Sequence, residues 1–164
     1  MIVRRFQPED IDAVFEIKQA AYGPLYEKYH DDLTNPFLNS KGVTMEKFLL
    51  GNTHGYVFVE DDEIVGYVRV KLYPEGTHKI STLSVHPKHQ NKGIAQQALA
   101  EIERIHSDAT RWFLDTILEE AGNCHLYEKM GYKRTGKTAK INDKMTLVFY
   151  EKIIQEKSKL ANAN

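Results

Sequence analysis

Cysteine is almost absent from this sequence, because Cys124 is the only one in 164 residues. A lone cysteine cannot form a disulfide within the chain, which excludes a disulfide-stabilised extracellular scaffold and favours a reducing compartment. Long apolar runs are missing too, since no stretch approaches the ~18 residues that a membrane-spanning helix needs. The N-terminal residues turn acidic and lack the apolar segment of a signal peptide. We therefore expect a cytoplasmic protein with no membrane partner.

An excess of charge of one sign is also missing. Lys and Arg together number 22, Asp and Glu number 23, and the formal net charge is -1. Domains that bind nucleic acid are usually basic or carry a basic face, so we expect no nucleic-acid partner. The composition, 41% hydrophobic and 27% charged, is ordinary for a globular protein. We expect one domain over residues 1–155 and a polar C-terminal tail over residues 156–164.

The spacing of apolar residues predicts an α/β (α+β) fold in which helices cover both faces of a mixed sheet. Strands are expected over residues 1–6, twice within a hairpin that spans 55–73, and over 78–87, 111–118, 131–141 and 143–154. Helices are expected over residues 7–22, 44–50, 92–108 and 120–131. Gly23 and Pro24 should end the first helix. Thr44 should cap the second helix, and Gly131 should close the last.

A strand-to-helix loop with the sequence VHPKHQNKGIA, residues 85–95, has the features of an anion site. The first amides of a helix have no intrahelical partner, and the helix dipole favours negative charge beside them. Gly93 has no Cβ, so a phosphate can approach the backbone closely. The alternative is a glycine that serves only the geometry of the turn. The loop is neither a Walker loop nor a dinucleotide fingerprint, because GxxxxGK[ST] is absent and Gly93 stands alone.

Two segments resemble motifs of the GNAT superfamily of N-acetyltransferases. LSVHPKHQNKGIAQQAL is similar to the acetyl-CoA signature of that superfamily, with Gln90, Gly93 and Ala95 at the signature positions. Downstream, NCHLYEKMGYK resembles the asparagine-containing helix of the same proteins. The resemblance extends over about residues 1–153. It implies a GNAT-like mixed, mostly antiparallel sheet of about seven strands with helices on both faces, and acetyl-CoA as co-substrate with no metal.

The resemblance also implies where acetyl-CoA would bind. The coenzyme would lie in a V-shaped gap between parallel strands at residues 79–86 and 111–117. Its pantetheine arm would pair with the main chain near Leu83 and Val85. Backbone amides of the loop, aided by the side chains of Gln90 and Lys92, would hold the pyrophosphate. The loop residues concerned are Gln90, Asn91, Lys92, Gly93, Ile94 and Ala95.

Three residues acquire chemical roles from the same resemblance. The Val85 amide would stabilise the oxyanion of the tetrahedral intermediate. Tyr127 would act as the general acid that protonates the leaving thiolate, and Asn123 would contact the coenzyme arm. The alternatives are a packed aromatic ring for Tyr127 and a simple helix cap for Asn123.

The sequence assigns no general base. Some members of the superfamily carry a glutamate on the strand before the loop, but the comparable position here is Lys79 and KISTLSV contains no acid. Four nearby side chains remain as candidates: Tyr73, Glu75, His78 and Asp115. Cys124 is interpreted as a packing residue, because adjacent residues such as His125 do not face each other on a helix.

The segment over residues 21–42 is expected to contribute to the acceptor pocket. Its aromatic and acidic side chains suit a cationic amine through cation–π attraction and charge. These side chains are Tyr22, Tyr26, Tyr29, His30, Asp31 and Asp32. The alternative is a surface loop that packs on its own aromatic rings. The acceptor is left open among polyamines, aminoglycoside-like amines, amino acids and peptide amines.

The function that the resemblance implies is direct transfer of an acetyl group from acetyl-CoA to a primary amine of a small molecule or peptide. One alternative is a non-catalytic GNAT-fold protein that binds acyl-CoA as a sensor or regulator. Another is a protein that binds a different phosphate ligand, such as a nucleotide. A homodimer through the last strands, residues 144–154, is compatible with the sequence.

Overall fold

The fold contains seven strands and four α-helices within residues 1–154, the part of the chain that the computed structural model describes. The predicted tail over residues 156–164 lies outside the described residues. The strands are β1 (Ile2–Arg5), β2 (Thr53–Glu60), β3 (Glu63–Tyr73), β4 (Thr77–Val85), β5 (Arg111–Ile117), β6 (Lys133–Lys140) and β7 (Thr146–Ile153). The helices are α1 (Ile11–Tyr29), α2 (Lys41–Phe48), α3 (Ile94–Ile105) and α4 (Ala121–Lys129).

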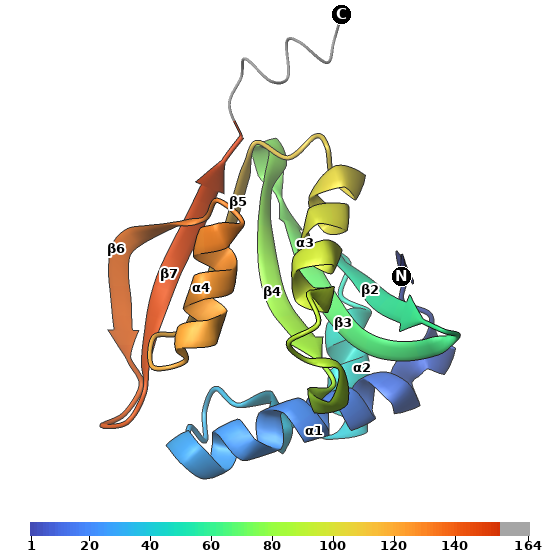
Figure 1. Cartoon of the computed structure of the whole chain (residues 1–164), viewed down its shortest axis with the longest axis horizontal. Helices are drawn as coiled ribbons and strands as arrows, with labels where there is room; N and C mark the ends of the chain where they lie inside the picture. The colour runs from blue at the N-terminus through green and yellow to red at the C-terminus, as the bar shows by residue number, and fades with distance from the viewer. Residues whose placement is uncertain (155–164) are drawn as a thin grey trace, which may run out of the picture.

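The strands form one sheet in the order β1-β2-β3-β4-β5-β7-β6 (Figure 1). Each neighbouring pair is antiparallel except β4 and β5, which run parallel. The β2–β3 hairpin turns at Asp61 and Asp62, which both have positive φ, as a tight turn between twisted strands requires. These features confirm the expected mixed, mostly antiparallel sheet.

Helices cover both faces of the sheet, and each face has its own core (Figure 1). On one face, Leu99 of the amphipathic helix α3 joins Val68 of β3 in a large buried cluster. On the other face, Val14 of α1 and Phe48 of α2 join Tyr67 of β3. Tyr67 and Val68 are consecutive, so they point to opposite sides of the strand. Each such buried side chain contributes about 1.5–3 kcal/mol to stability.

The first helix does not end at Gly23 and Pro24, as the sequence predicted. Helix α1 continues to Tyr29 with Pro24 inside it. A proline within a helix removes a backbone hydrogen bond and costs about 3 kcal/mol. Here the last turn is anchored by tertiary contacts, because the buried Tyr29 hydroxyl donates to Glu120 and Lys28 forms an ion pair with the same carboxylate at 2.8 Å. Packing therefore overrides the local signal.

The second helix begins earlier than predicted. Helix α2 is capped by Ser40, whose hydroxyl accepts a hydrogen bond from the Val43 amide at 3.2 Å. Thr44 is buried within the helix instead of capping it, and its hydroxyl accepts a hydrogen bond from Nζ of Lys18 at 3.0 Å. The prediction for the end of α4 is confirmed, because Gly131 follows that helix with φ of +93°.

The edges of the sheet limit how the chain can associate. Strand β7 lies between β5 and β6, so the last strands offer only β6 as a free edge. A homodimer through these strands stays a prediction. Among the described helices, none has both the length and the apolar character that crossing a membrane requires.

Candidate active site

The two parallel strands at the centre of the sheet separate after a short stretch of pairing. Strands β4 and β5 pair only between Thr77–Lys79 and Arg111–Phe113, while β5 pairs with β7 along its whole length. Beyond these residues β4 and β5 diverge, as Figure 1 shows, and a cleft of about 630 Å³ opens between them. Its walls include residues 80–85 of β4 and 115–117 of β5. The volume is typical of a small-molecule site.

The backbone of β4 turns hydrogen-bonding groups toward this cleft. The amide of His86 donates to the carbonyl of Val65 at 2.8 Å, so His86 faces β3. Backbone hydrogen-bonding groups alternate in direction along a strand. The amide and carbonyl of Ser84 therefore also point toward β3, whereas those of Leu83 and Val85 point toward the cleft. Both of these residues line it, where the sequence placed them. An extended ligand can therefore add to β4 like a further strand.

The glycine loop forms one end of the cleft. Asn91 and Gly93 have left-handed backbone conformations, with φ of +62° and +79°, and Gly93 is the N-cap of α3. Gln90, Asn91, Gly93, Ile94 and Ala95 all line the cleft. Because the first amides of α3 lack intrahelical partners, an anion at this end would meet several backbone donors and the positive end of the helix dipole.

Two side chains of this loop are placed differently from the expectation. Nε2 of Gln90 donates to the carbonyl of Val85 at 2.9 Å, so this side chain ties the loop to the end of β4. Lys92 is exposed and does not belong to the cleft wall. Direct contacts of these two side chains with a pyrophosphate stay predictions, and the backbone amides are the better-placed donors.

Helix α4 brings Asn123 and Tyr127 to the cleft wall, one helical turn apart. The Tyr127 ring is buried and meets the Tyr132 ring edge-on at a centroid distance of 5.9 Å. Burial, reinforced by Tyr22 and Asp115, raises the pKa of Tyr127, so the phenol stays protonated at neutral pH. Within the described residues no group is hydrogen-bonded to its hydroxyl. Tyr127 is thus a packed ring with a hydroxyl available to a ligand.

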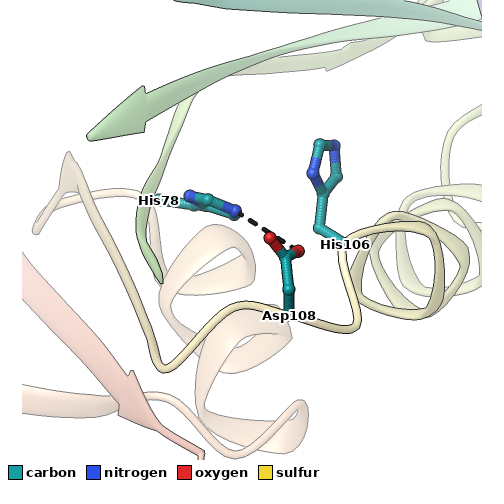
Figure 2. A group of neighbouring side chains, drawn as sticks. All are labelled: His78, His106 and Asp108. Carbon is teal, nitrogen blue, oxygen red and sulfur yellow. Dashed lines mark ion pairs between the residues drawn. The ribbon is translucent and has the colours of Figure 1, made fainter. Parts of the chain in front are cut away.

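Three of the four candidates for the general base lie away from the cleft. Tyr73 and Glu75 are exposed at the far end of β3 and in the turn that follows. His78 is buried against His106, and its Nε2 lies 4.0 Å from the carboxylate of Asp108 (Figure 2). None of the three candidates belongs to the cleft wall. The structure therefore argues against each of them as the base.

Asp115 is the candidate that does line the cleft. Its Oδ2 atom lies 3.5 Å from Nζ of Lys79, which occupies the position of the glutamate that some members of the superfamily carry on this strand. Lys79 is also the last residue of β4 that pairs with β5. The carboxylate thus comes from the neighbouring strand, at the point where the two strands begin to diverge.

Of the six side chains predicted for the acceptor pocket in residues 21–42, two line the cleft and four do not. Tyr22 and Asp31 line the cleft, and burial raises the pKa of Tyr22 to about 12. Asp31 is buried and accepts hydrogen bonds from Thr34 at 2.7 Å and from Asn35 at 3.0 Å. Its carboxylate is therefore engaged within its own loop.

The other four members of that segment lie outside the cleft wall: Tyr26, Tyr29, His30 and Asp32. The Tyr26 hydroxyl donates to Asp32 at 2.6 Å, and the Tyr26 ring stacks on Phe37 and meets His30 edge-on. These contacts fit the alternative in which the segment packs on its own aromatic rings, although Tyr26 and Tyr29 belong to the end of α1 and not to a loop.

Sequence reasoning missed two cations in the cleft wall, Arg69 of β3 and Lys47 of α2. Arg69 donates to the hydroxyl of Thr82 at 2.8 Å, and burial lowers the pKa of its guanidinium. Burial, together with Arg69 and Lys71, lowers the pKa of Lys47. The alternation of Arg69 and Lys71 with valines in β3 was a usable signal, because it marks a charged strand face.

Cys124 is buried, as the packing interpretation expected. Its Sγ atom lies 3.8 Å from the carbonyl of Ile117 and 3.9 Å from that of Leu118. The neighbouring His125 is exposed. This environment gives the thiol no adjacent base among the described residues.

Solved acetyltransferase structures share this fold over nearly the whole chain. The PaiA N-acetyltransferase of Thermoplasma acidophilum, in complex with coenzyme A, superposes with a TM-score of 0.77 at 15% identity, covering 93% of this chain and 98% of that one. The ribosomal-protein-S18-alanine N-acetyltransferase of Escherichia coli gives 0.75 at 12% identity, covering 94% of each chain. An aminoglycoside 6'-acetyltransferase type Ii gives 0.72 at 18% identity, covering 94% and 98%. Such low identities show a common fold and leave the acceptor open.

The sequence has no significant match among curated proteins. The family model for GNAT acetyltransferases matches residues 11–132, from the start of α1 to just beyond α4. This span includes both diverging strands, the loop at Gly93 and the tyrosine at position 127, which together form most of the cleft wall. The chain therefore belongs to the acetyltransferase (GNAT) family, whose enzymes use acetyl-CoA to acetylate amines.

Proposed function

We propose that this protein transfers the acetyl group of acetyl-CoA directly to a primary amine of a small molecule or peptide. The observation that carries the proposal is the cleft between β4 and β5. It brings together the loop amides, the cleft-facing backbone groups of Leu83 and Val85, and the hydroxyl-bearing ring of Tyr127. Acetyl-CoA supplies the activated thioester, and the residues of the chain bind it, orient it and move protons.

The chain offers a separate set of groups for each part of the coenzyme. The backbone amides of residues 91–95 suit the pyrophosphate, since they open a helix and Gly93 adds no Cβ there. The cleft-facing amide and carbonyl of Leu83 suit the peptide-like pantetheine arm. Val85 continues the same strand edge with its amide alone, because its carbonyl already accepts from Gln90. Asn123 lies in the first turn of α4 on the cleft wall, within reach of the same arm.

Two groups are proposed to stabilise the charges that develop in the reaction. The Val85 amide donates a hydrogen bond to the oxyanion of the tetrahedral intermediate. Tyr127 donates from its hydroxyl to the leaving sulfur. A thiol has a reference pKa of about 8.5, well below that of this phenol, so a hydrogen bond to the thiolate is favoured over complete proton transfer.

The acceptor amine must be neutral to attack, although an alkylamine has a reference pKa of about 10.4. The cations Arg69 and Lys47 in the cleft wall disfavour the ammonium form of an amine bound near them. Asp115 is the proposed proton acceptor, acting directly or through one water molecule. Its position in the wall and its ion pair with Lys79 support this assignment over Tyr73, Glu75 and His78.

Direct attack by the amine is proposed instead of a covalent acyl-enzyme. A cysteine nucleophile needs an adjacent base that forms the thiolate. The only cysteine of the chain, Cys124, lies against main-chain carbonyls, and its neighbour His125 is exposed. This environment supports transfer without a thioester to the protein.

The experiment that tests the proposal measures thiol release from acetyl-CoA with a panel of amino acids, polyamines, aminoglycosides and short peptides. Calorimetry measures coenzyme A binding on the same sample. Saturable binding and release with at least one amine class are expected. Binding without release for the whole panel would contradict the proposal and favour a sensor, whereas a nucleotide that bound more tightly than coenzyme A would contradict the assignment of the cleft.

A further inference from the structure

A small side pocket adjoins the wall of the main cleft. Its volume is about 20 Å³, and it shares Pro36, Lys47, Arg69 and Thr82 with the main cleft. Lys18 completes a set of three cationic side chains in its lining, which contains no carboxylate. A space of this size accepts one water molecule or one ligand oxygen.

The guanidinium of Arg69 has few partners for a buried cation. It donates to the neutral hydroxyl of Thr82, and no carboxylate within the described residues forms an ion pair with it. A guanidinium carries five N–H donors. A cation withdrawn from water is unfavourable unless charge or hydrogen bonds compensate it. A bound anion would supply both.

The two lysines of the side pocket add to this positive charge. Lys18 is 2% exposed, and its Nζ donates to the carbonyl of Asn39 at 2.5 Å and to Thr44 at 3.0 Å. Burial lowers the pKa of Lys18 to about 8. Lys47 has no ion pair with any described carboxylate, and Arg69 contributes to lowering its pKa. Both lysines therefore add positive charge beside the guanidinium of Arg69.

The carboxylates closest to this wall are already engaged. Asp31 accepts hydrogen bonds from Thr34 and Asn35, as described above. Asp115 faces Lys79 at 3.5 Å. In this wall of the cleft the carboxylates are thus compensated, whereas the positive charges of Arg69 and Lys47 are not.

The part of the cleft wall formed by Arg69 and Lys47, called here the cationic wall, is distinct from the end of the cleft assigned to the pyrophosphate. Arg69 lies two residues after Tyr67, on the sheet face that α1 and α2 cover. Its guanidinium is 6.0 Å from the ring centroid of Phe48, on α2. The pyrophosphate loop instead leads into α3, which packs on the opposite face with Val68. A coenzyme bound at the loop would leave the wall for another ligand.

We infer that the acceptor of this enzyme is an amine that also carries a carboxylate, and that Arg69 and Lys47 bind that carboxylate. The inference rests on the proposed acetyl transfer. The planar fork of an arginine matches a carboxylate in two parallel hydrogen bonds. One carboxylate oxygen fits the side pocket, and the amine then extends toward Asp115. A polyamine or an aminoglycoside would instead bring further positive charge against an already cationic wall.

The test compares amines that carry a carboxylate with amines that lack one. Thiol release is measured with α- and ω-amino acids, with their C-terminal amides, with the corresponding decarboxylated amines and with spermidine. Amino acids are expected to exceed their amides in kcat/KM by about tenfold or more, the ratio that a hydrogen-bonded charged pair provides. Amides or spermidine that react as fast as the acids would overturn the inference.

Variants then assign the effect to the wall. Arg69→Gln should remove the preference for the acids, so that the ratio of kcat/KM for an acid to that for its amide falls to about one. Lys47→Gln, at a half-buried helix position, should reduce the same preference and serves if Arg69→Gln does not fold. Lys71→Gln is the matched control, because Lys71 lies two residues along β3 and outside both cavities. Weaker coenzyme A binding in Arg69→Gln would overturn the inference by assigning Arg69 to the coenzyme.

A binding measurement separates this inference from the proposed function. Thermal shifts with the same acids and amides are recorded on the coenzyme A complex, where no turnover is needed. Stabilisation by acids alone, lost in Arg69→Gln, supports the carboxylate site even if no amine releases thiol and acetyl transfer fails. Equal shifts for acids and amides, or shifts unchanged in Arg69→Gln, would overturn it.

Discussion

Nζ of Lys79 lies 3.5 Å from Oδ2 of Asp115, across the point where β4 and β5 begin to diverge. This ion pair joins a cation on the strand that carries the proposed oxyanion donor to the carboxylate proposed as proton acceptor. The ion pair therefore fixes the proposed proton acceptor at the point where the cleft opens.

Removing the Asp115 carboxylate should slow acetyl transfer. Asp115→Asn keeps the shape of the side chain but cannot accept a proton, so kcat should fall about 100-fold at neutral pH. The deficit should shrink as the pH rises and more of the amine is already neutral. Steady-state rates between pH 6 and pH 10 check this, and a deficit that stayed constant over the range would contradict the role of base.

Removing the partner of Asp115 should slow turnover by releasing the carboxylate from its position. Lys79→Met deletes the ion pair at 3.5 Å that holds the Asp115 carboxylate, so kcat should fall about tenfold while coenzyme A affinity stays within about threefold. Lys79→Arg keeps the charge and is the control, with a smaller loss. Wild-type kcat in Lys79→Met would show that the ion pair does not position Asp115.

Tyr127→Phe should lower turnover more than coenzyme binding. The change removes one hydroxyl from a buried ring and leaves the ring packing against Tyr132 in place. We expect kcat to fall about tenfold to 100-fold, with coenzyme A affinity within about threefold of the original. Steady-state assays of thiol release give kcat, and calorimetry gives the affinity for coenzyme A. Wild-type turnover over the full pH range would rule out Tyr127 as the donor to sulfur.

Gly93→Ala should weaken coenzyme binding through the backbone. Gly93 has φ of +79°, and a Cβ there would meet only Nε2 of Gln97, at 3.9 Å. The space is open, so the penalty is the left-handed conformation, about 1–2 kcal/mol for a residue with a side chain. A relaxed loop would misplace the amides that face the anion, and we expect at least about tenfold weaker binding.

Gly51→Ala is the control for that change, since a Cβ at Gly51 meets nothing within 4 Å and its φ is not left-handed. Calorimetric titration of coenzyme A into both variants makes the comparison. Equal affinities would mean that Gly93 serves the turn alone.

The buried His106 should make the fold sensitive to mild acid. Burial, then the neighbours His78 and His54, lowers the pKa of His106 to about 4. Because the unfolded chain binds this proton near pH 6.5, the stabilisation is complete above pH 6.5 and is lost as the pH falls toward 4. The loss attributable to His106 between pH 7.5 and pH 5 is about 2 kcal/mol.

His106→Gln isolates this contribution, because glutamine does not titrate and can still pair with the hydroxyl of Tyr56, which lies 2.9 Å from Nε2 of His106. Urea unfolding at the two pH values should show a smaller loss of the free energy of unfolding in the variant than in the parent protein. Equal losses in the two proteins would assign the acid sensitivity to other groups.

Much of the fold was predictable because its signals are local. The alternation in β2 and β3, the amphipathic pattern of α3 and the glycines at positions 93 and 131 each act within a few residues. The end of α1 was not predictable in this way. Its continuation through Pro24 depends on Glu120, which is distant in sequence and supplies the partner for Tyr29.

The residues of the site also differ in whether local sequence predicts them. The glycine loop, Leu83, Val85 and Tyr127 sit in contiguous motifs. The last three line the cleft, and so do residues 90–95 of the loop apart from Lys92. The proton acceptor and the cationic wall could not be assigned from local sequence, because they depend on which side chains the diverging strands bring together. Lys18 shows the difficulty most clearly, since a lysine that is 2% exposed looks like any solvated helix residue in the sequence.

The central claim is that acetyl-CoA binds along the edge of β4 where β5 has moved away. Residue-resolved amide hydrogen exchange by NMR, with and without coenzyme A, tests it most directly. We predict that the amides of Leu83 and Val85, which face the cleft, become protected, together with those of residues 91–95, while Ser84, which faces β3, changes little. Unchanged exchange at Leu83 and Val85 under saturating coenzyme A would contradict the account.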